Sequence, residues 1–175
     1  HYIGNKPYDH KSTSRDSWYI SFLTFGEGFH NYHHKFQWDY RNGIRWFHFD
    51  PSKWSIWLLS RIGLAKELKK AGKFQIMKTK ALDSWNQVHE TLDSLPDQAK
   101  HSYHEKLCDI KIKLQNLEDS RQSAEKEVLA YFSDKKEMLL SKKLFRKQRT
   151  LQKFEYRAIM NSLSVMLFAI QTGQY

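Results

Sequence analysis

The chain has 175 residues, which is enough for one domain, or for one small domain with a helical appendage. Its formal net charge of +10 suits an anionic partner such as lipid headgroups or a nucleotide phosphate. The single cysteine, Cys108, excludes an intramolecular disulfide. The sequence contains no stretch of about 18 consecutive apolar residues, so no transmembrane helix is predicted within it.

The first part of the chain is predicted to be a loop followed by an aromatic helix. Pro7 lies in the polar segment over residues 1–17 and favours extended backbone and turns there. The spacing of aromatic side chains then predicts a helix over residues 16–35. Its expected core residues are Trp18, Phe22, Phe25 and Phe29. Gly26 and Gly28 weaken this helix by roughly 1 kcal/mol each relative to alanine, which indicates close packing against a neighbouring element.

The end of this predicted helix carries a cluster of three histidines, His30, His33 and His34. Positions i, i+3 and i+4 share one helix face, so the three imidazoles can approach one small volume. Neutral imidazole is the commonest protein ligand for transition metals, and we therefore expect a metal site. A surface cluster without metal is the alternative, because the spacing matches none of the usual zinc motifs.

The next helix is predicted to begin at Pro51, with Asp50 as its N-cap residue. It is expected to end near Gly63 or at Gly72. Its apolar stripe is formed by Trp54, Trp57, Leu58, Ile62 and Leu64. Two interpretations of this stripe stay open, because a tryptophan-rich amphipathic helix suits both a membrane interface and packing beneath the rest of the domain.

The second half of the chain is predicted to consist of long helices. Glycine and proline become rare after Phe74, and Pro96 predicts a boundary between two helices. Between Tyr103 and Met138, apolar residues recur at steps of three and four, which is the coiled-coil signature. A final helix is predicted over residues 141–172, so two or three long helices that fold back as a hairpin are the simplest architecture.

Two features of these helices bear on chemistry and partners. Cys108 follows Leu107 in the apolar stripe, so we expect a buried and unreactive thiol. A basic cluster is either the solvated face of a helix or a site for anionic lipid, and it comprises Lys142, Lys143, Arg146, Lys147 and Arg149. The sequence contains no nucleic-acid-binding motif, so lipid is favoured and no nucleic-acid partner is expected.

Several segments near the start of the chain resemble sequence motifs of one protein family. Residues 26–34 resemble the third histidine box of the membrane-bound acyl-CoA desaturases of the stearoyl-CoA type. Residues 1–9 resemble the family's stretch that begins with the histidine of an N-S-x-x-H motif. Residues 36–41 resemble its F-P-x-D-Y-R segment, with Gln37 at the usual proline position. The match continues at similar spacing through Trp46, Asp50, Pro51 and residues 63–65.

The resemblance implies a mostly α-helical protein with two parts. Residues 1–71 would be the carboxy-terminal part of the desaturase domain, a cytosolic helical cap that carries the third histidine box. Residues 72–175 would be a basic helical or coiled-coil extension, to which the resemblance does not extend. The spanning helices and the other histidine boxes would lie upstream, so we expect a carboxy-terminal piece that is inactive alone.

The resemblance also implies a cofactor and a reaction. Clustered histidines in this family hold two irons, and the expected metal ligands in this chain are His1, His30, His33 and His34. The parent enzyme would use O2 and electrons from a carrier such as cytochrome b5 or ferredoxin to introduce a cis double bond, of the Δ9 type, into a saturated fatty acyl-CoA. The parent would be a multi-pass membrane protein, with this segment on the cytosolic face and in contact with membrane lipid.

The sequence is also compatible with two functions other than that of a desaturase. A helical membrane-peripheral interaction module, which self-associates or docks a partner through residues 72–175, is one, and a related di-iron lipid hydroxylase is another. Asp9, Glu27 and Asp39 are either solvated carboxylates or groups that orient the histidines through their second ring nitrogen. Two other histidines, His10 and His48, are expected to be structural, because they match no ligand position.

Overall fold

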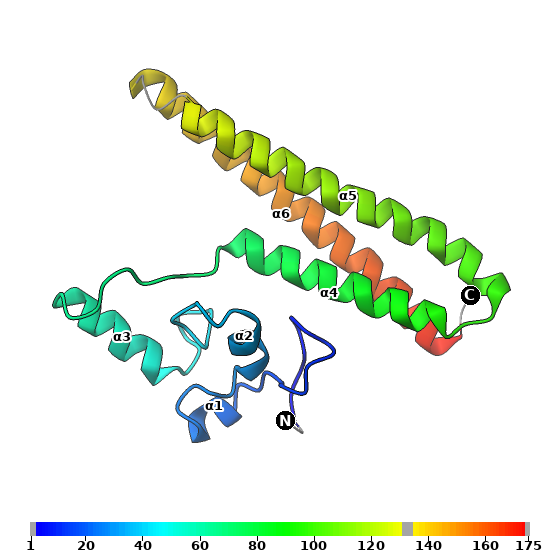
Figure 1. Ribbon diagram of the computed structural model, residues 1–175, viewed down its shortest axis with the longest axis horizontal. Helices are drawn as coiled ribbons and strands as arrows, with labels where there is room; N and C mark the ends of the chain where they lie inside the picture. Colours follow the sequence, from blue (N-terminus) through cyan, green and yellow to red (C-terminus); the bar gives the residue numbers. More distant parts are fainter. Residues whose placement is uncertain (1–2, 131–134, 174–175) are drawn as a thin grey trace. The chain divides into compact units, whose positions relative to one another are not determined.

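The computed structural model describes residues 3–130 and 135–173, which Figure 1 traces from blue to red. Helix accounts for 65% of the chain and the described residues contain no β-strand, which confirms the mostly α-helical class. The chain forms two compact units, His1–Asp83 and Ser84–Tyr175. The domain boundary predicted after residue 71 is not tested by this division, because the helix over Lys73–Asp93 extends from the first unit into the second.

The first unit contains short helices joined by irregular backbone. The helix predicted over residues 16–35 is wrong, since the structure has α1 (Ile20–Leu23) and α2 (His30–Lys35) with a turn between them. Phe25 and Gly26 have φ values of 51° and 103° in this turn, and an α-helix does not accommodate positive φ. The two glycines that weaken the predicted helix therefore belong to its interruption.

The core of the first unit also differs from the prediction. Of the four aromatic residues expected to be buried, only Phe29 is, whereas Trp18, Phe22 and Phe25 are exposed. Their spacing suggested one helix face, but the turn between α1 and α2 removes that common face. The observed core is a cluster of Tyr8, Tyr32, Phe36, Ala71 and Ile76.

The helix α3 (Pro51–Arg61) confirms its predicted start and the first of its two predicted ends, near Gly63, so Ile62 and Leu64 of the predicted stripe lie beyond it. Asp50 caps it by accepting a hydrogen bond from the backbone N–H of Lys53, and Pro51 occupies the first helical turn. Within the described residues, none of the helices is sufficiently long and apolar to cross a lipid bilayer.

The second unit consists of long helices: the later part of α4 (Lys73–Asp93), then α5 (Asp97–Ala130) and α6 (Lys135–Thr172). The boundary predicted at Pro96 is confirmed, and α6 begins six residues before the predicted residue 141. In Figure 1, α5 and α6 lie side by side where α5 ends and α6 begins, and they draw apart toward the red end of α6. The apolar positions of α5 that recur at steps of three and four are buried as far as Ala124: Leu107, Ile110, Leu114, Leu117 and Ala124.

Cys108 corrects one prediction for this unit. Its side chain is exposed, although the preceding Leu107 is only 1% exposed. Neighbouring residues on a helix point about 100° apart, so burial of one side chain turns the next one away. Of the predicted coiled-coil positions, Tyr131 lies outside the described residues, as do the side chains of Val128 and Met138.

Candidate metal centre

The histidine helix α2 is fixed from its inner side by Asn31, whose side chain is fully buried. The side-chain oxygen of Asn31 accepts hydrogen bonds from the backbone N–H groups of Tyr8 at 2.9 Å and Asp9 at 3.2 Å. Its amide nitrogen donates to the carbonyl oxygens of Asp9 at 3.0 Å and Ser14 at 3.2 Å. One side chain thus joins α2 to the loop that precedes it in the sequence, and all its polar atoms are satisfied.

Tyr32, the next residue, provides a second attachment on the same inner side. Its hydroxyl donates a hydrogen bond of 2.6 Å to Oδ2 of Asp39, and its backbone N–H donates to Oδ1 of Asp16 at 3.0 Å. The ring packs edge-on against Tyr8 and tilted against Phe36. Burial raises the pKa of the Tyr32 hydroxyl, and its hydrogen bond to Asp39 raises it further, so Tyr32 remains a donor.

Asp39 is a buried acceptor for four other N–H groups, one of which is the backbone N–H of Arg41 at 3.0 Å. Arg41 donates to it through Nε at 2.9 Å and through a terminal nitrogen at 2.7 Å, and the backbone N–H of Ala71 donates at 2.7 Å. Burial opposes ionisation of Asp39, but these bonds and the one from Tyr32 outweigh it and lower its pKa. Asp39 is therefore an ionised anchor for α2, neither a solvated carboxylate nor a direct partner of a histidine.

The other two candidate carboxylates lie nearer the surface. Asp9 accepts hydrogen bonds from the backbone of Lys11 and Ser12 and closes its own loop. Glu27 places a carboxylate oxygen 3.9 Å from Nδ1 of His30, so it is the carboxylate that lies beside a candidate ligand. This separation is an ion-pair distance and is longer than the hydrogen bond by which a carboxylate orients a metal-binding imidazole.

The structure brings two of the candidate metal ligands together. Nε2 of His30 and Nε2 of His34 lie 3.0 Å apart, and the two rings are nearly perpendicular, at 82°. Burial lowers the pKa of His30, the neighbouring His34 lowers it further, and Glu27 opposes this change. Lowering the pKa favours neutral imidazole, which is the form that binds a metal ion.

The two other candidate ligands are placed differently. The ring of His33 lies 6.1 Å from that of His34, and its Nδ1 atom is buried without a hydrogen-bond partner. His1 lies outside the described residues. Within residues 3–130 and 135–173, no group of three or more His, Cys, Asp or Glu side chains is close enough to hold a metal ion.

These donors fit one part of a histidine-ligated metal site. Two imidazole nitrogens bound to one ion at about 2.1 Å lie about 3 Å apart when the angle between them is near 90°. The separation of 3.0 Å between His30 and His34 agrees with that arrangement. The buried Nδ1 of His33 is a further ring nitrogen without a hydrogen-bond partner, but Nδ1 of His48 is buried without one as well, so this feature does not single out a metal ligand.

Two other histidines near the cluster have structural contacts, as expected. Nδ1 of His10 lies 2.8 Å from Oδ1 of Asp83, which connects the first loop to α4. His48 stacks on Phe29 with ring centroids 4.3 Å apart. Burial lowers the pKa of His48, and the nearby Lys53 lowers it further, so its stacked ring favours the neutral form.

Asn31 and Tyr32 are residues that the sequence analysis missed. Both lie between His30 and His33, and the prediction of a metal site from the histidines gave the intervening residues no role. Their positions in the helical repeat predict that they lie on the inner side of α2, because residues one and two places after His30 point away from the face that His30 and His34 share. A polar side chain on that inner face has to find partners, and Asn31 finds them in the preceding loop.

Comparison with known proteins confirms the resemblance to acyl-CoA desaturases over about 40% of the chain. A segment of 70 residues is 54% identical to Acyl-CoA desaturase 1 of Saccharomyces cerevisiae and covers 40% of this chain and 14% of that protein. A segment of 91 residues is 42% identical to a probable acyl-CoA desaturase of Schizosaccharomyces pombe and covers 49% of this chain and 19% of that protein.

A mammalian relative is also named as a desaturase. Stearoyl-CoA desaturase 5 of Bos taurus is 40% identical over 81 residues, which are 46% of this chain and 24% of that protein. The chain thus spans less than a third of the length of each of these relatives. No family model matches the chain, and no solved structure matches it.

Proposed function

We propose that this chain provides part of the iron site of an acyl-CoA desaturase, with His1, His30, His33 and His34 as ligands and with further ligands from elsewhere in the whole protein. The observation that carries the proposal is the 3.0 Å approach of His30 to His34 on a helix held from its other side. The identity of 54% to a yeast acyl-CoA desaturase supports the same conclusion.

The bound iron pair would supply the oxidising power that removes two hydrogens from an unactivated methylene pair, because no side chain has that power. The chain's own residues hold and orient the imidazoles. Burial favours the neutral form of His30, while Asn31 and Tyr32 fix the direction of α2 through buried hydrogen bonds. The substrate would be a saturated fatty acyl-CoA, and the products would be a cis double bond and water.

We further propose that the first unit lies at the cytosolic surface of a membrane, where it receives electrons from a carrier such as cytochrome b5 or ferredoxin. Its exposed aromatic side chains support this location, because indole rings favour the boundary between lipid and water and phenyl rings insert into its apolar side. These exposed residues are Trp18, Phe22, Phe25, Trp38, Trp46, Phe47, Trp54 and Trp57. The net positive charge of the chain favours anionic lipid headgroups.

The proposal is tested by the iron content of the full-length protein, purified in detergent, alongside His30→Ala, His34→Ala and the control His10→Gln. We expect about two irons per chain in the wild type and in His10→Gln, and less than half of that in the other two variants, because each loses a ligand. An active wild-type preparation with fewer than two irons would refute the di-iron assignment. Analysis of the product distinguishes a desaturase from a hydroxylase, since only the former yields a double bond.

A further inference from the structure

The helix α6 presents two apolar columns on different sides. One column is buried in the second unit and comprises Tyr156, Ile159, Leu163, Met166 and Ile170. The other is exposed, and we call it the outer seam: Leu144, Leu151, Phe154, Ala158, Val165 and Phe168. The outer seam follows the heptad steps of three, four and seven residues that a helix needs to pack against another helix.

The width of the outer seam favours a helix over a lipid surface as its partner. A helix that lies on a membrane has an apolar face about 100° wide or more, whereas a two-column seam is typical of coiled coils. Lys147 and Asn161 occupy seam positions and are exposed. Such polar interruptions are tolerated between helices, where they select orientation and register.

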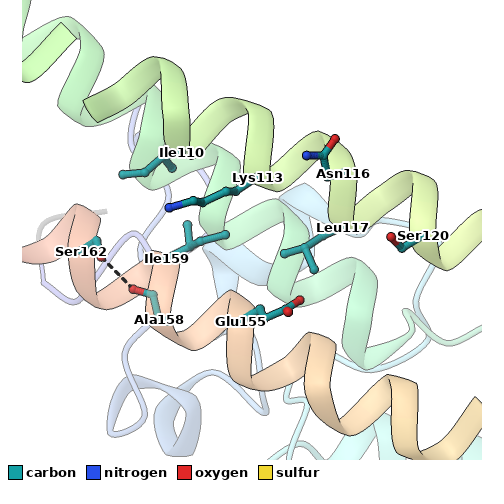
Figure 2. A pocket seen from close by; sticks show the side chains of 9 residues that line it. All are labelled: Ile110, Lys113, Asn116, Leu117, Ser120, Glu155, Ala158, Ile159 and Ser162. Atoms are coloured by element: carbon teal, nitrogen blue, oxygen red, sulfur yellow. Dashed lines mark hydrogen bonds between the residues drawn. The ribbon is translucent and has the colours of Figure 1, made fainter. Parts of the chain in front are cut away.

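The middle of the seam lies beside a groove. The groove has a volume of about 460 Å³ between α5 and α6, and Figure 2 shows the side chains that line it. Ala158 and Ser162 contribute its α6 side together with Glu155 and Ile159. Small side chains at this point allow a further helix to approach the backbone of α6 closely, while larger side chains flank the point on both sides.

Four of the five large side chains of the seam, all except Leu144, are arranged symmetrically about the midpoint between Ala158 and Asn161. Leu151 and Phe154 lie seven and four residues before Ala158. Val165 and Phe168 lie four and seven residues after Asn161. A two-fold rotation about the midpoint between Ala158 and Asn161 therefore brings the large side chains of one copy opposite the large side chains of a second copy. A two-fold interface requires this self-complementarity.

The distribution of charge selects the direction of such a pairing. Residues 143–157 of α6 carry several basic side chains, whereas residues 158–173 contain no charged residue. A parallel pair would bring Lys147 and its neighbours against the same residues of the second copy, which is unfavourable. An antiparallel pair places each basic half beside an uncharged half.

We propose that the outer seam of α6 is the surface through which two copies of this chain associate as an antiparallel helix pair. Leu151 of one copy packs on Phe168 of the other, Phe154 packs on Val165, and the helices cross at Ala158 and Asn161. This interface is independent of the metal site, so iron binding and association can succeed or fail separately.

Site-directed disulfide formation tests the pairing in the full chain, in detergent and in a Cys108→Ser background. The double variant Leu151→Cys/Phe168→Cys is expected to give a covalent dimer on mild oxidation. Each single variant is the matched control and is expected to give little dimer, because identical residues lie about 25 Å apart along an antiparallel pair. Dimer from the Leu151→Cys single variant alone would indicate parallel helices and overturn the proposal.

Sedimentation of the Cys-free chain gives a second readout. Phe154→Glu is expected to weaken dimerisation at least about tenfold, because it places a carboxylate in the seam. Phe154 is 73% exposed, so the helix content measured by circular dichroism should not change. Ile112→Glu, at an exposed position of α5 outside the seam, is the control that should still dimerise. A monomeric wild type, an unaffected Phe154→Glu dimer, or a monomer bound to anionic vesicles would each overturn the proposal.

Discussion

The hydroxyl of Tyr32 lies 2.6 Å from Oδ2 of Asp39, and this hydrogen bond connects the histidine helix to a buried ion pair. Arg41 lies 2.7 Å from the same carboxylate oxygen, and the backbone N–H of Ala71 also donates to it. The helix α2 is therefore fixed to residues about 40 positions further along the chain. This network holds the inner side of α2, while His30 and His34 approach each other away from it.

Tyr32→Phe removes the hydroxyl and keeps the ring in the core. We expect a loss of about 1–2 kcal/mol in the free energy of unfolding, because a hydrogen bond to a charged acceptor is lost while Arg41 still pairs with Asp39. Urea unfolding followed by tryptophan fluorescence measures this loss. Tyr40→Phe is the control, since it keeps the ring that Lys70 covers. An equal loss in both variants would contradict a special role for the Tyr32 hydroxyl.

Asp16 gives the first unit a defined dependence on pH. Burial raises the pKa of Asp16 from 3.8 to about 6, and its hydrogen bond from the backbone of Tyr32 only partly opposes this change. The folded chain therefore holds a proton that the unfolded chain releases in this range. The stability from Asp16 is fully present below about pH 4 and is lost as the pH rises through about 6.

Asp16→Asn should remove this dependence, because its side-chain oxygen still accepts the N–H of Tyr32 and its amide does not titrate. We expect the variant to gain free energy of unfolding relative to the wild type as the pH rises from about 4 to about 6, with little further change above about 7. Urea titrations of both proteins across this range measure the difference, in which the contributions of all other groups cancel. A difference that is constant with pH would contradict the prediction.

The parts of the fold that the sequence predicted correctly depend on local signals. Asp50 and Pro51 specify the start of α3 through capping and a fixed φ value, and Pro96 separates α4 from α5 because proline has no backbone N–H with which to continue a helix. The interruption between α1 and α2 was missed, because it depends on contacts between residues that only the folded chain brings together. Gly28 lies against the backbone of Ser17 and Ser21, which agrees with the close packing predicted from the two glycines, but the local spacing does not identify these partners.

The candidate site was predictable to a similar degree. Residues four apart on a helix point within about 40° of each other, so the approach of His30 to His34 follows from their spacing. Adjacent residues point about 100° apart, which separates the rings of His33 and His34. The buried partners of Asn31 and Tyr32 come from distant segments, and periodicity contains no information about them.

Gly28→Ala tests the close approach of the turn before α2 to Ser17 and Ser21. An added Cβ would overlap backbone atoms of Ser17 and Ser21, which a side-chain rotation cannot relieve. We expect a loss of about 3 kcal/mol or more in the free energy of unfolding, measured by urea titration. Gly72→Ala is the matched control, because an added Cβ meets nothing within 4 Å there, and it should be neutral or slightly stabilising. Equal effects at both glycines would contradict the packing described here.

Asp50→Ala tests the carboxylate that organises the segment before α3. Asp50 is fully buried and accepts hydrogen bonds from three backbone N–H groups, those of Asn42 at 2.8 Å, Gly43 at 2.9 Å and Lys53 at 3.0 Å. Alanine leaves all three donors without this partner, so we expect a loss of about 2–4 kcal/mol in the free energy of unfolding.

Asp50→Ser separates the two roles of this residue. Its hydroxyl can still cap α3 at Lys53 but cannot replace both oxygens of the carboxylate. We expect it to recover about 1 kcal/mol of the loss seen with alanine, in the same urea titration. If serine and alanine gave the same loss, capping would contribute nothing, and the bonds to Asn42 and Gly43 would account for the whole effect. If alanine gave no loss, the buried carboxylate would have no part in holding this segment together.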